Sequence, residues 1–183
     1  IKIALFNGKM FEKFLQDLTY MKRKKVRGLI LDLRNNPGGD VNEALRVVAR
    51  FVPQGVLAWS TKKNEPDFPL QSISGEVFPS KIVLLVNEGT ASAAEIATAA
   101  LSENKRAVTA GRRTFGKGVV QTVFKPTSET ELYLTTEVYL TPEKNNFNGT
   151  GILPEIVLEN SGLNPDPTKD SFVRYAWNYL KKG

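Results

Sequence analysis

The sequence of 183 residues contains no histidine and no cysteine. Without them the chain holds neither a Ser-His-Asp triad nor a Cys-His pair, and it cannot build a zinc site from imidazole or thiolate ligands. The absence of cysteine also excludes disulfide bonds. Covalent catalysis must therefore use serine, threonine, lysine or a carboxylate, and proton transfer must use Lys, Tyr, Asp or Glu.

Long hydrophobic runs are missing as well. The densest are LILDL at 29–33 and IVLLV at 82–86, whereas a membrane span needs roughly 20 apolar residues. No signal peptide is recognisable and the chain opens inside an apparent strand, so we expect it to be part of a longer protein. The hydrophobic content of 41% is enough for the core of one domain, which we expect to occupy residues 1–183.

Acidic residues are fewer than basic ones, 19 against 25, which gives a net charge of +6. Much of this excess lies in KRKK at 22–25. The cluster follows a predicted helix, where basic side chains complement the helix dipole. Because neither interleaved aromatic residues nor a nucleic-acid motif accompanies it, we interpret it as a solvated helix end and expect no nucleic-acid partner.

Helical and extended patterns alternate along the chain, which predicts an α/β fold. Expected strands cover residues 1–6, 28–33, 56–59, 82–86, 119–124 and 131–140, and expected helices cover about 11–21, 44–51, 92–103 and 168–182. Residues 61–80 are polar and contain three prolines, so they are expected to form a loop or an insertion.

The first candidate functional segment is DLRNNPGG at 32–39, where a buried strand leads into a turn and then a helix. Two glycines at such a turn let the backbone approach a ligand closely and direct N–H groups toward it. Taken alone, the segment is better explained as a tight turn that requires glycine.

The second segment, NEGTASAAEI at 87–96, places Ser92 at the start of a helix among small residues. A helix N-terminus offers unpaired N–H groups and a positive dipole end to a developing oxyanion. However, Ser92 and Glu95 also fit a capping box, which is the better explanation of this segment taken alone.

The third segment, GRRTFGKGVVQ at 111–121, places Lys117 between two glycines. An isolated lysine in a turn is commonly a surface residue. The segment is not a phosphate-binding P-loop, because Gly118 stands where Ser or Thr would bind magnesium and the following residues are strand-like.

Taken together, the three segments and GILPEIVL at 151–158 resemble the tail-specific, or C-terminal processing, peptidases of peptidase family S41. The resemblance covers nearly the whole chain and includes the order and spacing of the motifs. It implies that Ser92 is the nucleophile, that Lys117 is the general base and that Gln121 orients the lysine. It further implies that the backbone N–H groups of Gly38 and Ala93 form the oxyanion hole.

The same resemblance implies a single α/β domain of the crotonase and Clp-peptidase type, with a mixed sheet flanked by helices and residues 159–183 as a C-terminal extension. The expected activity is that of a serine endopeptidase that hydrolyses protein substrates near their C-termini through an acyl-enzyme, without a metal or cofactor. Family members usually carry a PDZ domain, and no such segment is present here. An extracytoplasmic location is likewise implied by the resemblance alone.

A lysine acts as a base only when it is neutral, and burial in apolar surroundings favours the neutral form. We therefore expect the turn at 116–118 to be buried, and a neutral Gln121 suits the base better than a carboxylate would. Two alternatives stay open. The first alternative to a peptidase is a non-catalytic ligand- or peptide-binding module of the same fold. The second is an acyl-CoA enzyme of the crotonase type, which would leave Ser92 and Lys117 unexplained.

Overall fold

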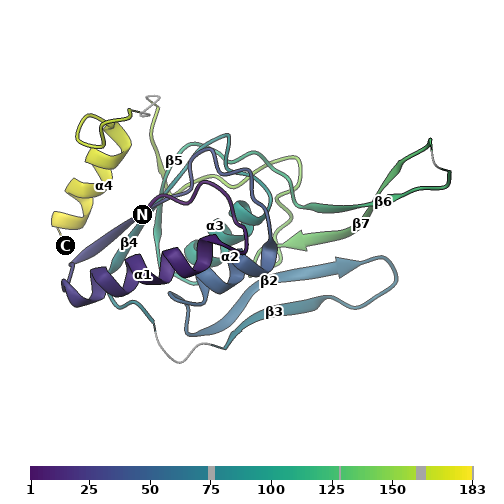
Figure 1. The fold of residues 1–183 in the computed structure, drawn as a ribbon, viewed down its shortest axis with the longest axis horizontal. Helices are drawn as coiled ribbons and strands as arrows, with labels where there is room; N and C mark the ends of the chain where they lie inside the picture. Colours follow the sequence, from purple (N-terminus) through teal and green to yellow (C-terminus); the bar gives the residue numbers. More distant parts are fainter. Residues whose placement is uncertain (74–76, 128, 160–163, 183) are drawn as a thin grey trace.

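The computed structural model describes residues 1–73, 77–127, 129–159 and 164–182. Within these ranges it contains one parallel and one antiparallel sheet, together with helices that cover the parallel sheet (Figure 1). The predicted α/β class is confirmed. No helix in these ranges is long and apolar enough to cross a membrane.

The parallel sheet has the strand order β1-β4-β5-β8. It is formed by β1 (Gly28–Asp32), β4 (Lys81–Val86), β5 (Val108–Gly111) and β8 (Ile156–Val157). A parallel sheet is usually covered on both faces, and this explains why β1 and β4 read as unbroken apolar runs in the sequence.

Helices lie on both faces of this sheet. They are α1 (Met10–Arg23), α2 (Val41–Val48), α3 (Ala93–Glu103) and α4 (Ser171–Lys181). Because side chains of a strand alternate between faces, β4 contributes to two clusters.

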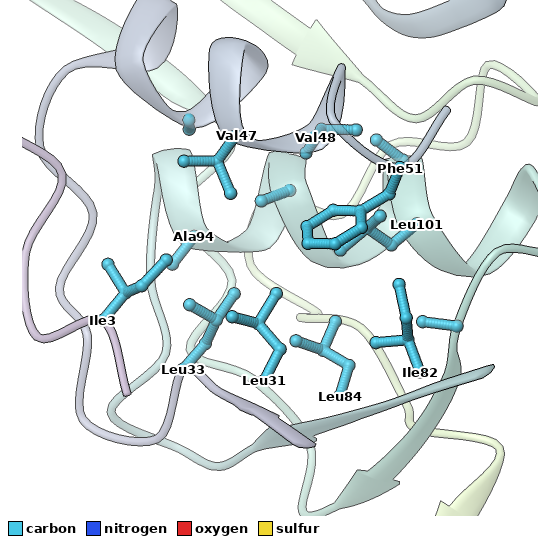
Figure 2. Packing of buried hydrophobic residues seen from close by; sticks show 14 of the residues in the cluster. Ile3, Leu31, Leu33, Val47, Val48, Phe51, Ile82, Leu84, Ala94 and Leu101 are labelled. Atoms are coloured by element: carbon cyan, nitrogen blue, oxygen red, sulfur yellow. The ribbon is translucent and has the colours of Figure 1, made fainter. Parts of the chain in front are cut away.

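Leu84 of β4 packs in the large cluster with α1, α2 and α3, whereas Val83 and Leu85 pack with Phe172 and Ala176 of α4. Figure 2 shows the large cluster, in which strand residues face side chains from α2, its C-terminal end and α3; the labelled members are Ile3, Leu31, Leu33, Val47, Val48, Phe51, Ile82, Leu84, Ala94 and Leu101. The two clusters hold β4 in place, and the predicted nucleophile follows this strand.

The antiparallel sheet has the order β3-β2-β7-β6. Its strands are β2 (Gln54–Lys62), β3 (Phe68–Ile73), β6 (Val119–Phe124) and β7 (Leu132–Leu140). The β6–β7 hairpin projects away from the helices, at the opposite end of the molecule from α4 (Figure 1).

Several local expectations differ from the structure. The helix expected over about 44–51 is α2, which spans Val41–Val48 and begins earlier because Asp40 caps it by accepting from the Asn42 N–H. The stretch 61–80, expected to be a loop, contains the edge strand β3, which pairs with β2 and accommodates Pro69 because an edge strand leaves one side free of ladder hydrogen bonds. Residues 1–6 form two isolated parallel bridges, from Lys2 to Asp32 and from Phe6 to Gly39, in place of the expected strand.

The predicted C-terminal extension, 159–183, includes α4. Its residues 160–163 and 183 lie outside the described residues, as do 74–76 of the predicted loop.

Candidate active site

Ser92 lies directly before α3, at the end of the turn that follows β4. Its backbone has φ +55° and ψ −121°, a conformation that costs a non-glycine residue about 1–3 kcal/mol and persists only when its surroundings enforce it. One such constraint is Thr90, whose hydroxyl donates to the Leu33 carbonyl at 2.9 Å and whose backbone N–H donates to Asn87 at 2.9 Å. The half-buried Ser92 is thus held in a strained turn.

Gly38 lies against this turn. A Cβ atom at Gly38 would stand 2.8 Å from the Ser92 Cβ and 3.0 Å from the Ala93 backbone nitrogen. Gly38 also has φ +107°, which disfavours any side chain. The structure therefore brings together three of the residues singled out in the sequence, from segments more than fifty positions apart.

Hydrogen bonds between asparagines hold these two turns together. The Asn35 N–H donates to Asn87 Oδ1 at 2.8 Å, and Asn87 Nδ2 donates back to Asn35 Oδ1 at 2.9 Å. The Ala91 N–H donates to the backbone carbonyl of Asn36 at 2.9 Å. The turn after β1 is consequently fixed to the residue that precedes Ser92.

The two predicted oxyanion donors differ in their present partners. The Ala93 N–H donates no hydrogen bond to any residue in the ranges that the structure describes. The Gly38 N–H donates to Asn36 Oδ1 at 2.8 Å. One donor is therefore available to a substrate oxygen, and the other is engaged within the protein.

A fully buried carboxylate, Glu95, connects the Ser92 turn to the Lys117 turn. Its Oε2 atom accepts hydrogen bonds from the Ser92 N–H at 3.0 Å and the Lys117 N–H at 2.7 Å. Its Oε1 atom accepts from the Thr114 hydroxyl at 2.5 Å and the Gly116 N–H at 2.7 Å. The backbones of the predicted nucleophile and the predicted base therefore share one acceptor atom.

Lys117 combines a buried turn with an exposed side chain. Gly116 and Gly118 are buried, as expected, but the lysine side chain is exposed to solvent. Within the described ranges, no acidic side chain forms an ion pair with Lys117. The expected burial of the turn is thus correct for its glycines and wrong for the lysine side chain.

Gln121 lies in β6, opposite Thr135 in the β7 register. Its side chain is exposed and forms no hydrogen bond with the part of the chain that the structure describes. The structure therefore does not join Gln121 to Lys117, and its predicted role stays a prediction.

A buried ion-pair network connects the turn after β1 to the N-terminus of α4. Arg34 donates to Asp32 at 2.9 and 2.7 Å and to Asp170, the N-cap of α4, at 3.0 Å. Burial alone would lower the pKa of Arg34, but these hydrogen bonds raise it above its usual value. Burial opposes ionisation of Asp170 too, yet the bond from Arg34 holds its pKa below the usual range. The network links the C-terminal helix to the turn.

The profile of peptidase family S41 matches residues 1–158. The chain belongs to this family. The resemblance inferred from the motifs is confirmed. The family is one of peptidases, and the relatives below are named as proteases.

The chain is 38% identical over 165 residues to a carboxy-terminal-processing protease of Bartonella bacilliformis, covering 87% of this chain and 38% of the relative. It is 30% identical over 159 residues to a carboxyl-terminal-processing protease of Synechocystis, covering 87% of this chain and 37% of the relative. Another relative, from Staphylococcus haemolyticus, is named a probable CtpA-like serine protease; the two are 38% identical over 133 residues, 71% of this chain and 27% of the relative.

The solved structure of a photosystem II D1 C-terminal processing protease superposes with a TM-score of 0.82 at 32% identity. The match covers 96% of this chain and 45% of that one. The S41 chain therefore spans less than half the length of these relatives.

The sequence did not predict that Glu95 accepts hydrogen bonds from the Lys117 turn. The capping box identified its bond with the Ser92 N–H, but the donors from the Lys117 turn lie about twenty residues away and are mostly backbone groups, which leave no side-chain signal. The sequence also predicted turns around Asn36 and Asn87, but it predicted no role for either side chain. Among the residues that the structure describes, no group of three or more acidic, His or Cys side chains could hold a metal ion.

Proposed function

We propose that this chain is the catalytic core of a serine endopeptidase in which Ser92 is the nucleophile and Lys117 is the general base. The observation that carries the proposal is the shared acceptor: Glu95 Oε2 receives the backbone N–H groups of both residues. The backbones of Ser92 and Lys117 are therefore each held by a hydrogen bond to the same oxygen atom. Membership of a peptidase family supports the proposal.

The proposed reaction begins when neutral Lys117 takes the proton of the Ser92 hydroxyl as Oγ attacks a peptide carbonyl carbon. The carbonyl oxygen becomes an oxyanion that the N–H groups of Ala93 and Gly38 stabilise. When the C–N bond breaks, Lys117 returns the proton to the departing amine, leaving an ester on Ser92. Lys117 then takes a proton from a water molecule as the water oxygen attacks this ester, and it returns that proton to Ser92 Oγ as the ester C–O bond breaks, which releases the acid product.

Because the Lys117 side chain is exposed, the substrate itself would displace water from it. A peptide lying across the turn would cover the lysine side chain and displace water from it, and removing water favours the neutral amine. No carboxylate of the described ranges opposes this step by pairing with the ammonium form. In the covered state, the neutral amide of Gln121 would orient the amine.

The substrate class follows from the relatives, which are named for carboxyl-terminal processing. We propose that the substrate is a polypeptide cleaved near its C-terminus. A PDZ domain or another segment outside this chain would present that C-terminus to Ser92.

The test is cleavage of a random peptide library by purified protein, read by mass spectrometry. Ser92→Ala and Lys117→Ala are each expected to lower cleavage on the order of 10³-fold or more, because the nucleophile and base act as a unit. Matched controls are Ser102→Ala, on the same helix as the Ser92 turn, and Lys125→Ala, on the adjoining hairpin, neither of which should alter the rate.

Persistent cleavage in Ser92→Ala, with folding intact by circular dichroism, would refute the assignment. If the unmodified protein bound library peptides without cleaving any, the alternative of a non-catalytic binding module would be favoured instead.

A further inference from the structure

The hydrogen bond from the Gly38 N–H to Asn36 Oδ1 has a consequence for the oxyanion hole. A backbone N–H has one hydrogen, and at 2.8 Å that hydrogen is committed to the asparagine. Gly38 nevertheless lies where a donor is needed, because its Cβ position is 2.8 Å from the Ser92 Cβ and 3.0 Å from the Ala93 nitrogen. A substrate oxygen at this place must take the hydrogen from Asn36.

Asn36 is fixed in this role by its other bonds. Its side chain is fully buried, and Nδ2 donates to the Ile3 carbonyl at 3.0 Å. Because the Ile3 oxygen requires a donor and the Gly38 N–H requires an acceptor, only this orientation of the amide satisfies both. Its backbone carbonyl also accepts from the Ala91 N–H.

We propose that Asn36 Oδ1 is an internal substitute for the oxyanion, which keeps the Gly38 donor occupied until negative charge develops on the substrate. The proposal rests on the proposed function of Ser92. Asn36 acts through Gly38 and is a positioning residue.

The preference for the charged state follows from the two acceptors. A neutral substrate carbonyl and the neutral asparagine oxygen are similar acceptors, so binding of the ground state offers little gain over the existing bond. An oxyanion makes a charge-assisted bond that is roughly twice as strong, and it wins the exchange. The Gly38 donor therefore contributes mainly in the transition state, where an interaction raises kcat.

The exchange requires only a local change. Gly38 has no side chain to obstruct rotation of the peptide unit between Pro37 and Gly38. The bond from Asn36 Nδ2 to Ile3 and the Asn35–Asn87 pair do not involve this N–H, so they hold the turn in place while the donor changes partner.

The test compares binding of a peptide aldehyde, which forms a tetrahedral adduct with a serine hydroxyl, with binding of the peptide amide of the same sequence. The sequence is taken from a cleaved library peptide. The ratio of the two affinities is measured within each variant, so a partial loss of folded protein lowers both affinities and leaves the ratio unchanged.

Asn36→Ala removes the competing acceptor for both ligands, so the amide and the aldehyde should each bind about tenfold more tightly, with the aldehyde-to-amide ratio unchanged. Asn36→Asp supplies a stronger acceptor and a negative charge beside the oxyanion, so aldehyde affinity and kcat should fall on the order of 10²-fold with little change in KM. Asn42→Asp is the matched control, because it makes the same exchange at an exposed position of α2 whose side chain forms none of the hydrogen bonds that hold the two turns together. It should leave the ratio unchanged.

An aldehyde preference that Ser92→Ala abolishes, but that Asn36→Asp leaves intact, would overturn this inference while the proposed function stood. If the unmodified protein showed no preference for the aldehyde, both proposals would fall. Should Asn36→Ala fail to fold, the ratio in Asn36→Asp decides alone, because a partial loss of folded protein leaves that ratio unchanged.

Discussion

Glu95 shares two carboxylate oxygens among donors from two segments of the chain, the Ser92 turn and the turn at 114–117. Each oxygen of a carboxylate has two lone-pair positions, so two donors per oxygen satisfy it completely. Such bonds to an ionised acceptor are stronger than bonds between neutral groups. At the scale of single residues, this buried acid sets the distance between the proposed nucleophile and base.

Replacing Glu95 by glutamine tests that function. One carboxylate oxygen becomes an NH₂ group, which cannot accept from the backbone donors that face it, so the Lys117 turn should detach from the Ser92 turn. We expect stability to fall by about 2–3 kcal/mol because buried donors lose their partner. Peptide cleavage should fall by much more than the unfolded fraction explains.

Urea unfolding and the library assay measure the two effects. Thr114→Ser, which keeps the hydroxyl donor to Glu95, serves as the control and should retain most activity. A Glu95→Gln variant that cleaved peptides at the unmodified rate would contradict the positioning role.

The roles of Ser92 and Lys117 come from the resemblance of the motifs to S41 peptidases, because each segment taken alone is better explained by a helix cap or a surface lysine. These roles stay predictions. The contacts of Glu95 and Asn36 were not predictable, because their partners are backbone N–H groups whose positions depend on how distant turns pack. The solvent exposure of Lys117 depends on the same packing.

At the scale of secondary-structure elements, the C-terminal helix is joined by charge to the turn after β1. Asp170 caps α4 by accepting from the backbone N–H groups of Phe172 and Val173 at 3.0 Å, and it also receives Arg34. Arg34 is 3% exposed, so removal of its partner would leave a buried cation incompletely compensated.

Asp170→Asn should therefore lower stability by about 3 kcal/mol at neutral pH, although asparagine still caps a helix. The folded-state pKa of Asp170 is lowered by Arg34, so its stabilisation is present above the unfolded-state pKa and is lost as the pH falls through the folded value. The difference between the two proteins should shrink as the pH drops below about 4.

Urea unfolding at pH 7 and pH 3 measures this difference. Glu159→Gln, which changes an exposed carboxylate of the C-terminal extension, should have little effect at either pH. An Asp170→Asn destabilisation equally large at both values would show that the loss is one of packing.

Elements with a consistent apolar period were predicted well. The boundaries of β6 agree with the sequence pattern, and α1, α3 and α4 lie where the helical spacing places them. The strand β3 was missed because Pro69 and the polar residues around the strand are loop-like, and its stability comes from pairing with β2. Pairing between strands is a tertiary property that a local pattern does not contain.

At the scale of the whole molecule, the two sheets have different surroundings. The parallel sheet lies between helices and holds the core, whereas the β6–β7 hairpin projects beyond it (Figure 1). Large apolar side chains at the far part of this hairpin are accessible, including Phe124 at 44% and Leu132 at 45%. These residues bury little area and should contribute little to folding.

Shortening the hairpin tests this division of the molecule. Val123 and Tyr133 face each other in the β6–β7 register, so residues 124–132 can be replaced by Asn-Gly, which favours a two-residue hairpin turn. The free energy of unfolding should change by less than about 1 kcal/mol. By comparison, Leu84→Ala, at a fully buried position of β4, should lower it by about 3 kcal/mol. If the shortened protein lost as much stability as Leu84→Ala, the hairpin would be an integral part of the folded core.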